Sequence, residues 1–138
     1  MSVTSVCNTL KRVGSVISLA LLCYGCTTIA RPTILLPSPQ QDLDTLLSTH
    51  PLHPDQNIKA VALGKTVAMS YHLVQIRDRE QPHLHATHDL VVTVLRSTGT
   101  LFLGGKEHPM APGDSAVIPS GIPHYFVNTG DTPAAALV

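Results

Sequence analysis

Three histidines in two short segments have the residue type and the spacing to bind one metal ion. His83 and His85 are one residue apart, and His124 follows the turn sequence Pro119-Ser-Gly-Ile-Pro123. Alternate residues of an extended strand point to the same face, so His83 and His85 can share a divalent ion. Pro82 favours an extended backbone here. The glycine and prolines of the turn allow the chain to reverse before His124.

A carboxylate would complete a mixed nitrogen and oxygen shell, which suits Fe, Mn, Ni, Cu or Zn. Asp89 lies four residues after His85 and has the same strand parity, so it is the expected acidic ligand. His88 is the alternative, and it reaches the same face only if a bulge or turn intervenes. The sequence predicts a metal site with His83, His85, Asp89 and His124 as ligands, and leaves open whether His88 replaces Asp89.

The chain from about residue 60 onward has the pattern of an all-β domain. Short apolar runs alternate with turn sequences such as Gly104-Gly105 and Ala111-Pro-Gly-Asp114. The run Leu90–Leu95 is apolar almost throughout, which is typical of a strand buried on both faces. Near-regular spacing of short strands predicts a β-barrel or sandwich. The strands are expected at 67–76, 90–95, 100–103, 115–118, 124–127 and 134–138.

The residues around His124 resemble the second motif of the cupin superfamily, G-x5-P-x-G-x2-H-x3-N. Every fixed position matches, with Gly113, Pro119, Gly121, His124 and Asn128 in place. We expect Asn128 to hydrogen-bond a turn rather than contact the metal.

The first cupin motif, G-x5-H-x-H-x3/4-E-x6-G, is matched only in part. His83 and His85 fit, and Asp89 takes the place of the glutamate at the shorter spacing. Arg77 stands where the motif has its first glycine, and Leu90 stands where the glutamate falls at the longer spacing. Arg96 or Ser97 stands in place of the second glycine, and Gly99 is nearby but out of register.

The resemblance covers about residues 60–138. It implies a jelly-roll barrel of roughly six to eight strands, with His83, His85 and His124 as ligands and Asp89 in the acidic position. Aspartate is one methylene shorter than glutamate, which implies a tighter site or an additional water. The resemblance also suggests a homodimer.

The N-terminal segment is typical of a secretory signal. Lys11 and Arg12 precede an uncharged apolar or small stretch, 13–25, which is too short to span a membrane. Its end, Leu22-Cys-Tyr-Gly-Cys26, resembles a bacterial lipobox in which Cys26 is lipidated. We expect a signal peptide at 1–25, a lipidated cysteine, tether and short helix at 26–59, and the barrel at 60–138. Plain secretion and a retained anchor are the alternatives to a periplasm-facing lipoprotein of the cell envelope.

A short helix is expected between the tether and the barrel. Ser38 is the expected N-cap, with Pro39 at the first helical position and Gln41 completing a capping box. The leucines at 43, 46 and 47 would form the apolar face, and the helix would end near Thr49. We expect this face to pack on the outside of the barrel.

Composition excludes some classes of function. The 138 residues suit one domain and carry no formal net charge, and no basic stripe indicates nucleic-acid binding. Tryptophan is absent and aromatic residues make up 4% of the chain, which disfavours a sugar site built on stacked rings.

Three functions fit these features. The first is a metal-binding envelope lipoprotein that binds a small molecule. The second is a metal-dependent enzyme, either an oxygenase or an isomerase/epimerase, and the third is a structural lipoprotein without catalysis. An enzyme needs a further acid or base near the metal, for which the candidates are Tyr71, His72, His88 and Glu107. The sequence does not decide whether the chain is an enzyme.

Overall fold

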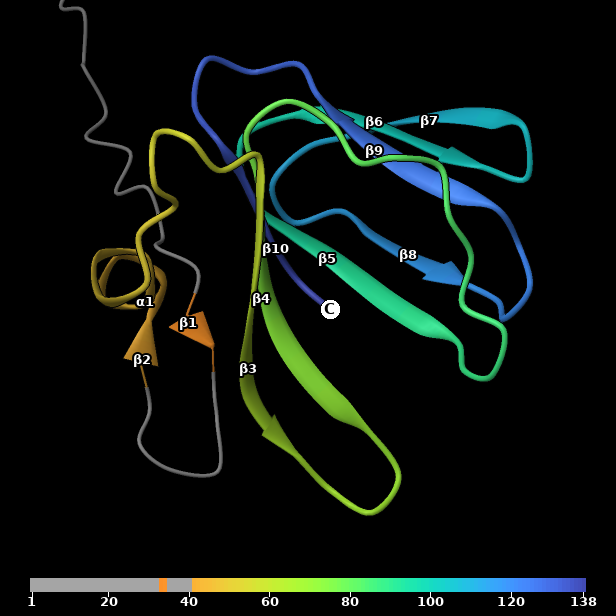
Figure 1. The fold of residues 1–138 in the computed structure, drawn as a ribbon, viewed down its shortest axis with the longest axis horizontal. Helices are drawn as coiled ribbons and strands as arrows, with labels where there is room; N and C mark the ends of the chain where they lie inside the picture. The colour runs from red at the N-terminus through yellow and green to blue at the C-terminus, as the bar shows by residue number, and fades with distance from the viewer. Residues whose placement is uncertain (1–32, 35–40) are drawn as a thin grey trace, which may run out of the picture.

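A computed structural model describes residues 33–34 and 41–138 (Figure 1). Short strands dominate this part of the chain, and they are joined by tight turns and a longer loop before β5. In chain order the elements are β1 (Thr33–Ile34), β2 (Gln41–Asp42), α1 (Leu43–Thr49), β3 (Ile58–Lys65), β4 (Ser70–Ile76), β5 (Leu90–Arg96), β6 (Gly99–Leu103), β7 (Lys106–Met110), β8 (Ser115–Ile118), β9 (His124–Asn128) and β10 (Ala134–Leu137).

Two antiparallel sheets form the body of the domain. The larger has the strand order β3-β4-β10-β5-β8, the smaller has the order β7-β6-β9, and β1 and β2 form a separate pair. The apolar residues that face one another between the two sheets are Ile76, Val94, Leu101, Met110, Ile118, Phe126 and Ala134. The expected all-β jelly roll is confirmed, as two facing sheets that are not joined into a closed barrel.

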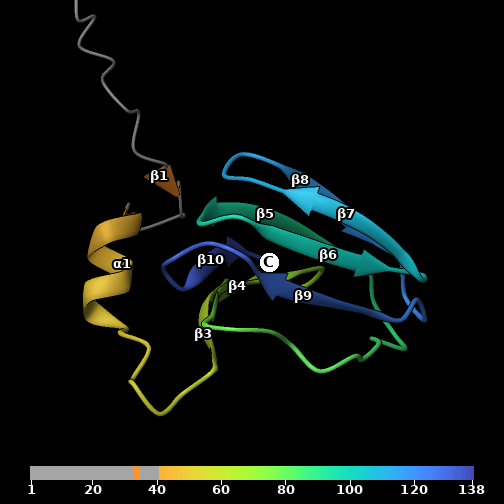
Figure 2. The same cartoon turned by 90° about the horizontal axis from the view of Figure 1, so that it is seen from above.

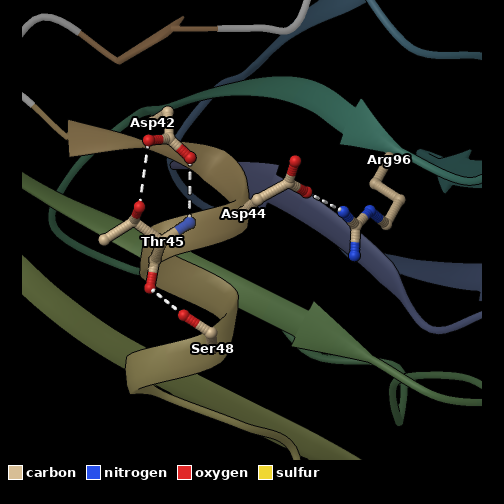
Figure 3. Close-up of polar contacts among 5 residues, drawn as sticks. All are labelled: Asp42, Asp44, Thr45, Ser48 and Arg96. Carbon is tan, nitrogen blue, oxygen red and sulfur yellow. Dashed lines mark hydrogen bonds and ion pairs between the residues drawn. The ribbon is translucent and has the colours of Figure 1, made fainter.

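The helix α1 packs on the outer face of the five-stranded sheet, beside β3, β4 and β10 (Figure 2). Leu43 and Leu46 are buried there against Leu73, which has no exposed surface. The expected packing of this helix against the sheet is therefore confirmed. An ion pair between Arg96 and Asp44, with an N–O distance of 2.6 Å, joins the helix to β5 (Figure 3).

The start of the helix corrects the expectation that Ser38 is its N-cap. The cap is Asp42, whose carboxylate accepts hydrogen bonds from the Thr45 N–H and the Thr45 hydroxyl, both at 2.9 Å (Figure 3). These bonds lower the pKa of Asp42. Gln41 is extended and pairs with Ile34, so it cannot serve in the first turn of a helix.

The strand β7 was not expected from the sequence. Its segment Lys-Glu-His-Pro-Met is polar and contains Pro109, which argues against a central strand. It lies at the edge of the three-stranded sheet, where an unpaired proline nitrogen is tolerated.

The first expected strand, 67–76, begins too early. Residues 67–69 lie in the turn between β3 and β4, which closes through a bond of 2.7 Å from the Thr66 N–H to the Met69 carbonyl. The Thr66 hydroxyl also accepts bonds from Ala68 and Met69.

The expectation that β5 is buried on both faces is wrong. Val91 is 61% exposed, and its partner on β8, Val117, is 62% exposed. Both valines lie on the outer face of the sheet, which the helix covers around β3, β4 and β10 but not at this corner.

No helix in the range 41–138 is long and apolar enough to cross a membrane. The expected signal peptide and the expected lipidation site, Cys26, lie outside the described residues.

Candidate metal centre

Three imidazoles from two segments converge at one end of the space between the sheets. Each of His83, His85 and His124 offers a nitrogen atom, and these atoms lie within 4.8 Å of one another. The ring centroids of His83 and His124 are 4.5 Å apart, and that of His85 is 5.2 Å from His83 and 5.4 Å from His124. The expected convergence of these three side chains is present in the fold.

Backbone pairing places His83 opposite His124. The His83 N–H donates to the His124 carbonyl at 3.0 Å, and the His124 N–H donates to the His83 carbonyl at 2.8 Å. His124 opens β9, and His83 joins it by an isolated bridge. This backbone pairing brings the two rings together.

Hydrogen bonds to carbonyl groups orient two of the rings. The Nδ1 atom of His83 lies 2.9 Å from the Gln81 carbonyl oxygen, and that of His124 lies 2.9 Å from the Ile122 carbonyl oxygen. A carbonyl can only accept, so Nδ1 carries the proton in both rings. The neutral rings then present the lone pairs of Nε2, as metal-binding histidines with a fixed outer partner do.

The Nε2 atom of His124 is buried and has no hydrogen-bond partner among the residues that the structure describes. Only 4% of His124 is exposed. An unsatisfied buried nitrogen costs about 1–3 kcal/mol, and a metal ion bound to its lone pair would remove that cost. The donor set of three imidazoles therefore fits a transition metal.

The third ring, His85, is held in its neutral form. Partial burial lowers the pKa of His85, and the neighbouring rings of His83, His88 and His124 lower it further. At neutral pH this ring therefore has a lone pair available for a metal ion.

Asp89 does not lie in the histidine cluster. Its carboxylate accepts a hydrogen bond of 2.8 Å from the Ser120 N–H, in the turn that precedes His124. The Gly121 N–H donates to the His85 carbonyl at 2.7 Å. These two bonds hold the turn against the segment that carries His85, so Asp89 positions the site. Its role as the fourth ligand stays a prediction.

His88, the alternative fourth ligand, lies beside the cluster. Its ring centroid is 4.8 Å from that of His85. It is not among the described side chains whose ligand atoms gather within 4.8 Å of one another.

The other residues of the second motif shape the turns around the site. Gly121 has φ +76°, a conformation that favours glycine. The side-chain amide of Asn128 donates to the carbonyls of Arg77 and Thr132, both at 2.8 Å. The expectation that Asn128 bonds a turn is confirmed.

A residue outside both motifs, Glu80, also positions the site. The segment before His83 runs beside β9, and the Glu80 N–H donates to the Phe126 carbonyl at 2.9 Å. From Glu80 to His83 this segment has one residue more than β9 has from Phe126 to His124, so the segment bulges. The Glu80 carboxylate accepts the Phe126 N–H at 2.9 Å and so satisfies the donor at this bulge. No sequence motif marks this role, since it depends on the register of the two segments.

We expect Glu80→Ala to weaken metal binding about tenfold, because the unpaired Phe126 N–H would disturb the register of His83 against His124. Glu80→Gln keeps an oxygen acceptor and should bind metal nearly as tightly as the wild type. Competition with a metal-binding dye measures both affinities. Equal affinity in Glu80→Ala and the wild type would contradict this role.

The three rings line a cavity of about 900 Å³ between the sheets. Tyr71, His72 and His88, which the sequence offered as possible acids or bases, also line it, together with Glu80. Glu107 does not, because it lies exposed on the edge strand β7.

Residues 71–138 match a family model described as a cupin domain. An uncharacterized protein of Aquifex aeolicus is 41% identical over 76 residues, which cover 55% of this chain and 63% of that protein. This chain thus matches less than two thirds of that relative's length.

Solved structures share the fold. The TT1209 protein of Thermus thermophilus is 26% identical with a TM-score of 0.59, and the match covers 67% of this chain and 89% of that one. KdgF from Halomonas sp. is 23% identical with a TM-score of 0.55, covering 65% of this chain and 86% of that one. A cupin-2 domain protein of Shewanella frigidimarina is 18% identical with a TM-score of 0.57, covering 69% and 89%. The last two similarities concern the fold alone.

Proposed function

Because residues 71–138 form a domain of the cupin superfamily, we propose that this chain binds one transition-metal ion and uses it to hold a small molecule. The ligands are His83, His85 and His124. The observation that carries the proposal is the buried Nε2 atom of His124, which faces the other rings without a hydrogen-bond partner among the described residues. A bound ion would supply Lewis acidity toward a carboxylate, enolate or hydroxyl group.

The protein itself sets the geometry of this site. Carbonyl groups fix the tautomers of His83 and His124, and burial keeps His85 neutral. Asp89 completes the shell if its carboxylate turns from the Ser120 N–H, and water takes the position otherwise. Fe, Mn, Zn, Ni and Cu all accept three imidazoles and an oxygen ligand.

Elemental analysis of the full chain, purified without chelator or histidine tag, tests the proposal. We expect about one equivalent of a transition metal, and its loss when His83 and His85 are both changed to alanine. Iron would favour oxygen chemistry, whereas zinc or manganese would favour binding or isomerisation. Metal-free wild-type protein that takes up no added metal would refute the site and favour a structural lipoprotein.

A metal-dependent enzyme, either an oxygenase or an isomerase/epimerase, is the second candidate. It is favoured by Tyr71, His72, His88 and Glu80, which are titratable and line the same cavity as the three ligands. Such a group could move a proton to or from a molecule held at the metal.

We also propose that the chain is exported and anchored in the cell envelope by lipid on Cys26, facing the periplasm. The support is the basic and apolar pattern of residues 11–25 and the small Gly25 before the cysteine. We expect Cys26→Ser to remain unprocessed and to lose radiolabelled palmitate, whereas Cys23→Ser is processed normally. Equal labelling of Cys26→Ser and the wild type would contradict lipidation at this residue.

A further inference from the structure

The walls of the cavity beside the histidines are mainly apolar. Its described lining includes Ile58, Ala60, Val74, Leu90, Val92, Val94, Ala136 and Val138. Its volume of about 900 Å³ is near the upper end of the usual range for small-molecule pockets. Two further lining residues, Val67 and Met69, lie in the turn between β3 and β4 and are 108% and 64% exposed. The cavity therefore has an apolar interior and an apolar rim.

Several polar side chains of this lining are already engaged with other groups of the protein, although Ser70, Tyr71 and His72 also line the cavity. The hydroxyl of Thr66 already accepts bonds from the backbone, and that of Thr93 is 2.8 Å from the Ser115 hydroxyl. The carboxylates of Glu80 and Asp89 accept backbone N–H groups. A sugar would lose its hydrogen bonds to water on entering and regain only part of them.

Positive charge in the cavity would be concentrated at the metal. Lys65 is the only lysine or arginine among the described lining residues, and it is exposed beside the turn between β3 and β4. Three neutral imidazoles leave the charge of a divalent ion uncompensated, and one aspartate would compensate only half of it. An anionic oxygen donor complements this charge, and the apolar walls complement a hydrocarbon body.

We propose that the molecule held here is a monocarboxylic acid with an aliphatic body, bound by its carboxylate to the metal and by its chain to the walls formed by β3, β4 and β5. This inference rests on the proposed metal site. It differs from that proposal in naming the chemical class of the ligand.

Calorimetry on the metal-loaded full chain tests the class. Hexanoate and gluconate have the same number of carbons and one carboxylate each, but gluconate carries hydroxyls along its body, and the one beside the carboxylate gives it a second donor for the metal. We expect hexanoate to bind at least tenfold more tightly than gluconate, and decanoate at least fivefold more tightly than hexanoate, because added methylenes are buried. Metal-free protein should bind all three acids at least tenfold more weakly.

A matched pair of variants localises the binding. Ala60 and Ala62 are both exposed on β3, but only Ala60 lines the cavity. We expect Ala60→Asp to weaken decanoate binding about tenfold, with the metal content unchanged, and Ala62→Asp to have little effect. Equal effects of the two variants on decanoate binding would contradict the placement of the aliphatic chain against β3.

Measuring the metal content first separates the two proposals. Wild-type protein that takes up no metal refutes the metal site. Metal-loaded protein that prefers gluconate, or that binds none of the acids, overturns the ligand class alone. A dimer in solution that binds none of them would favour a second copy as the occupant of the cavity, and this result also overturns the ligand class.

Discussion

His124→Ala is expected to lower the metal content of the purified protein by well over half. The residue is the most buried of the three ligands, and its Nδ1–H is fixed on the Ile122 carbonyl so that Nε2 faces the other two rings. Loss of this ring would leave two imidazoles, His83 and His85, which come from the same short segment. Two adjacent ligands bind a transition metal far more weakly than three.

Thermal unfolding gives this prediction a second measurement. A ligand present at a hundred times its Kd stabilises the folded state by about 2.7 kcal/mol, so a chelator should lower the Tm of the wild type by several degrees. The chelator should leave the Tm of His124→Ala unchanged. His72→Ala is the matched control, because His72 lines the same cavity outside the cluster and its loss should preserve metal content. Equal metal content in His124→Ala and the wild type would show that the ring is not a ligand.

The part of the site that the sequence predicted is the part that local spacing determines. One intervening residue puts His83 and His85 on one face, and the glycine and prolines before His124 set its turn. Strand parity predicts Asp89 as the acidic ligand only if the strand is unbroken from His85 onward. The segment between His85 and β5 contains a bend instead, so the aspartate carboxylate reaches the Ser120 N–H.

Features that depend on partners distant in sequence were not predictable in the same way. Glu80 acts through the pairing of its segment with β9, which no local pattern reveals. The strand β7 forms because its backbone pairs with β6, although its own residues have low strand propensity. The N-cap of the helix is Asp42 rather than Ser38 because Gln41 and Asp42 pair with β1. In each case a contact between separated segments overrides a local preference.

Gly99→Ala is expected to destabilise the fold by about 3 kcal/mol or more, through overpacking of a site with no room for a methyl group. Gly99 opens β6 between β7 and β9, where it pairs with Met110 and Asn128. A methyl group there would collide with the Phe126 ring and the Val127 carbonyl oxygen. Phe126 belongs to the core between the sheets, and the carbonyl belongs to the backbone of β9, so neither can move without disturbing the strand that carries His124.

Urea denaturation followed by circular dichroism measures this loss as a lower midpoint at unchanged slope. Gly64→Ala is the matched control, since it introduces the same methyl group in a strand of the larger sheet. There the added atom would meet the far end of the Tyr71 side chain, which can turn aside, so we expect a loss of about 1 kcal/mol or less. If the two variants lost the same stability, the close packing of β6 against β9 would not be what requires glycine at position 99. A larger loss for Gly99→Ala would show that β6 packs against β9 too closely for a side chain at this position.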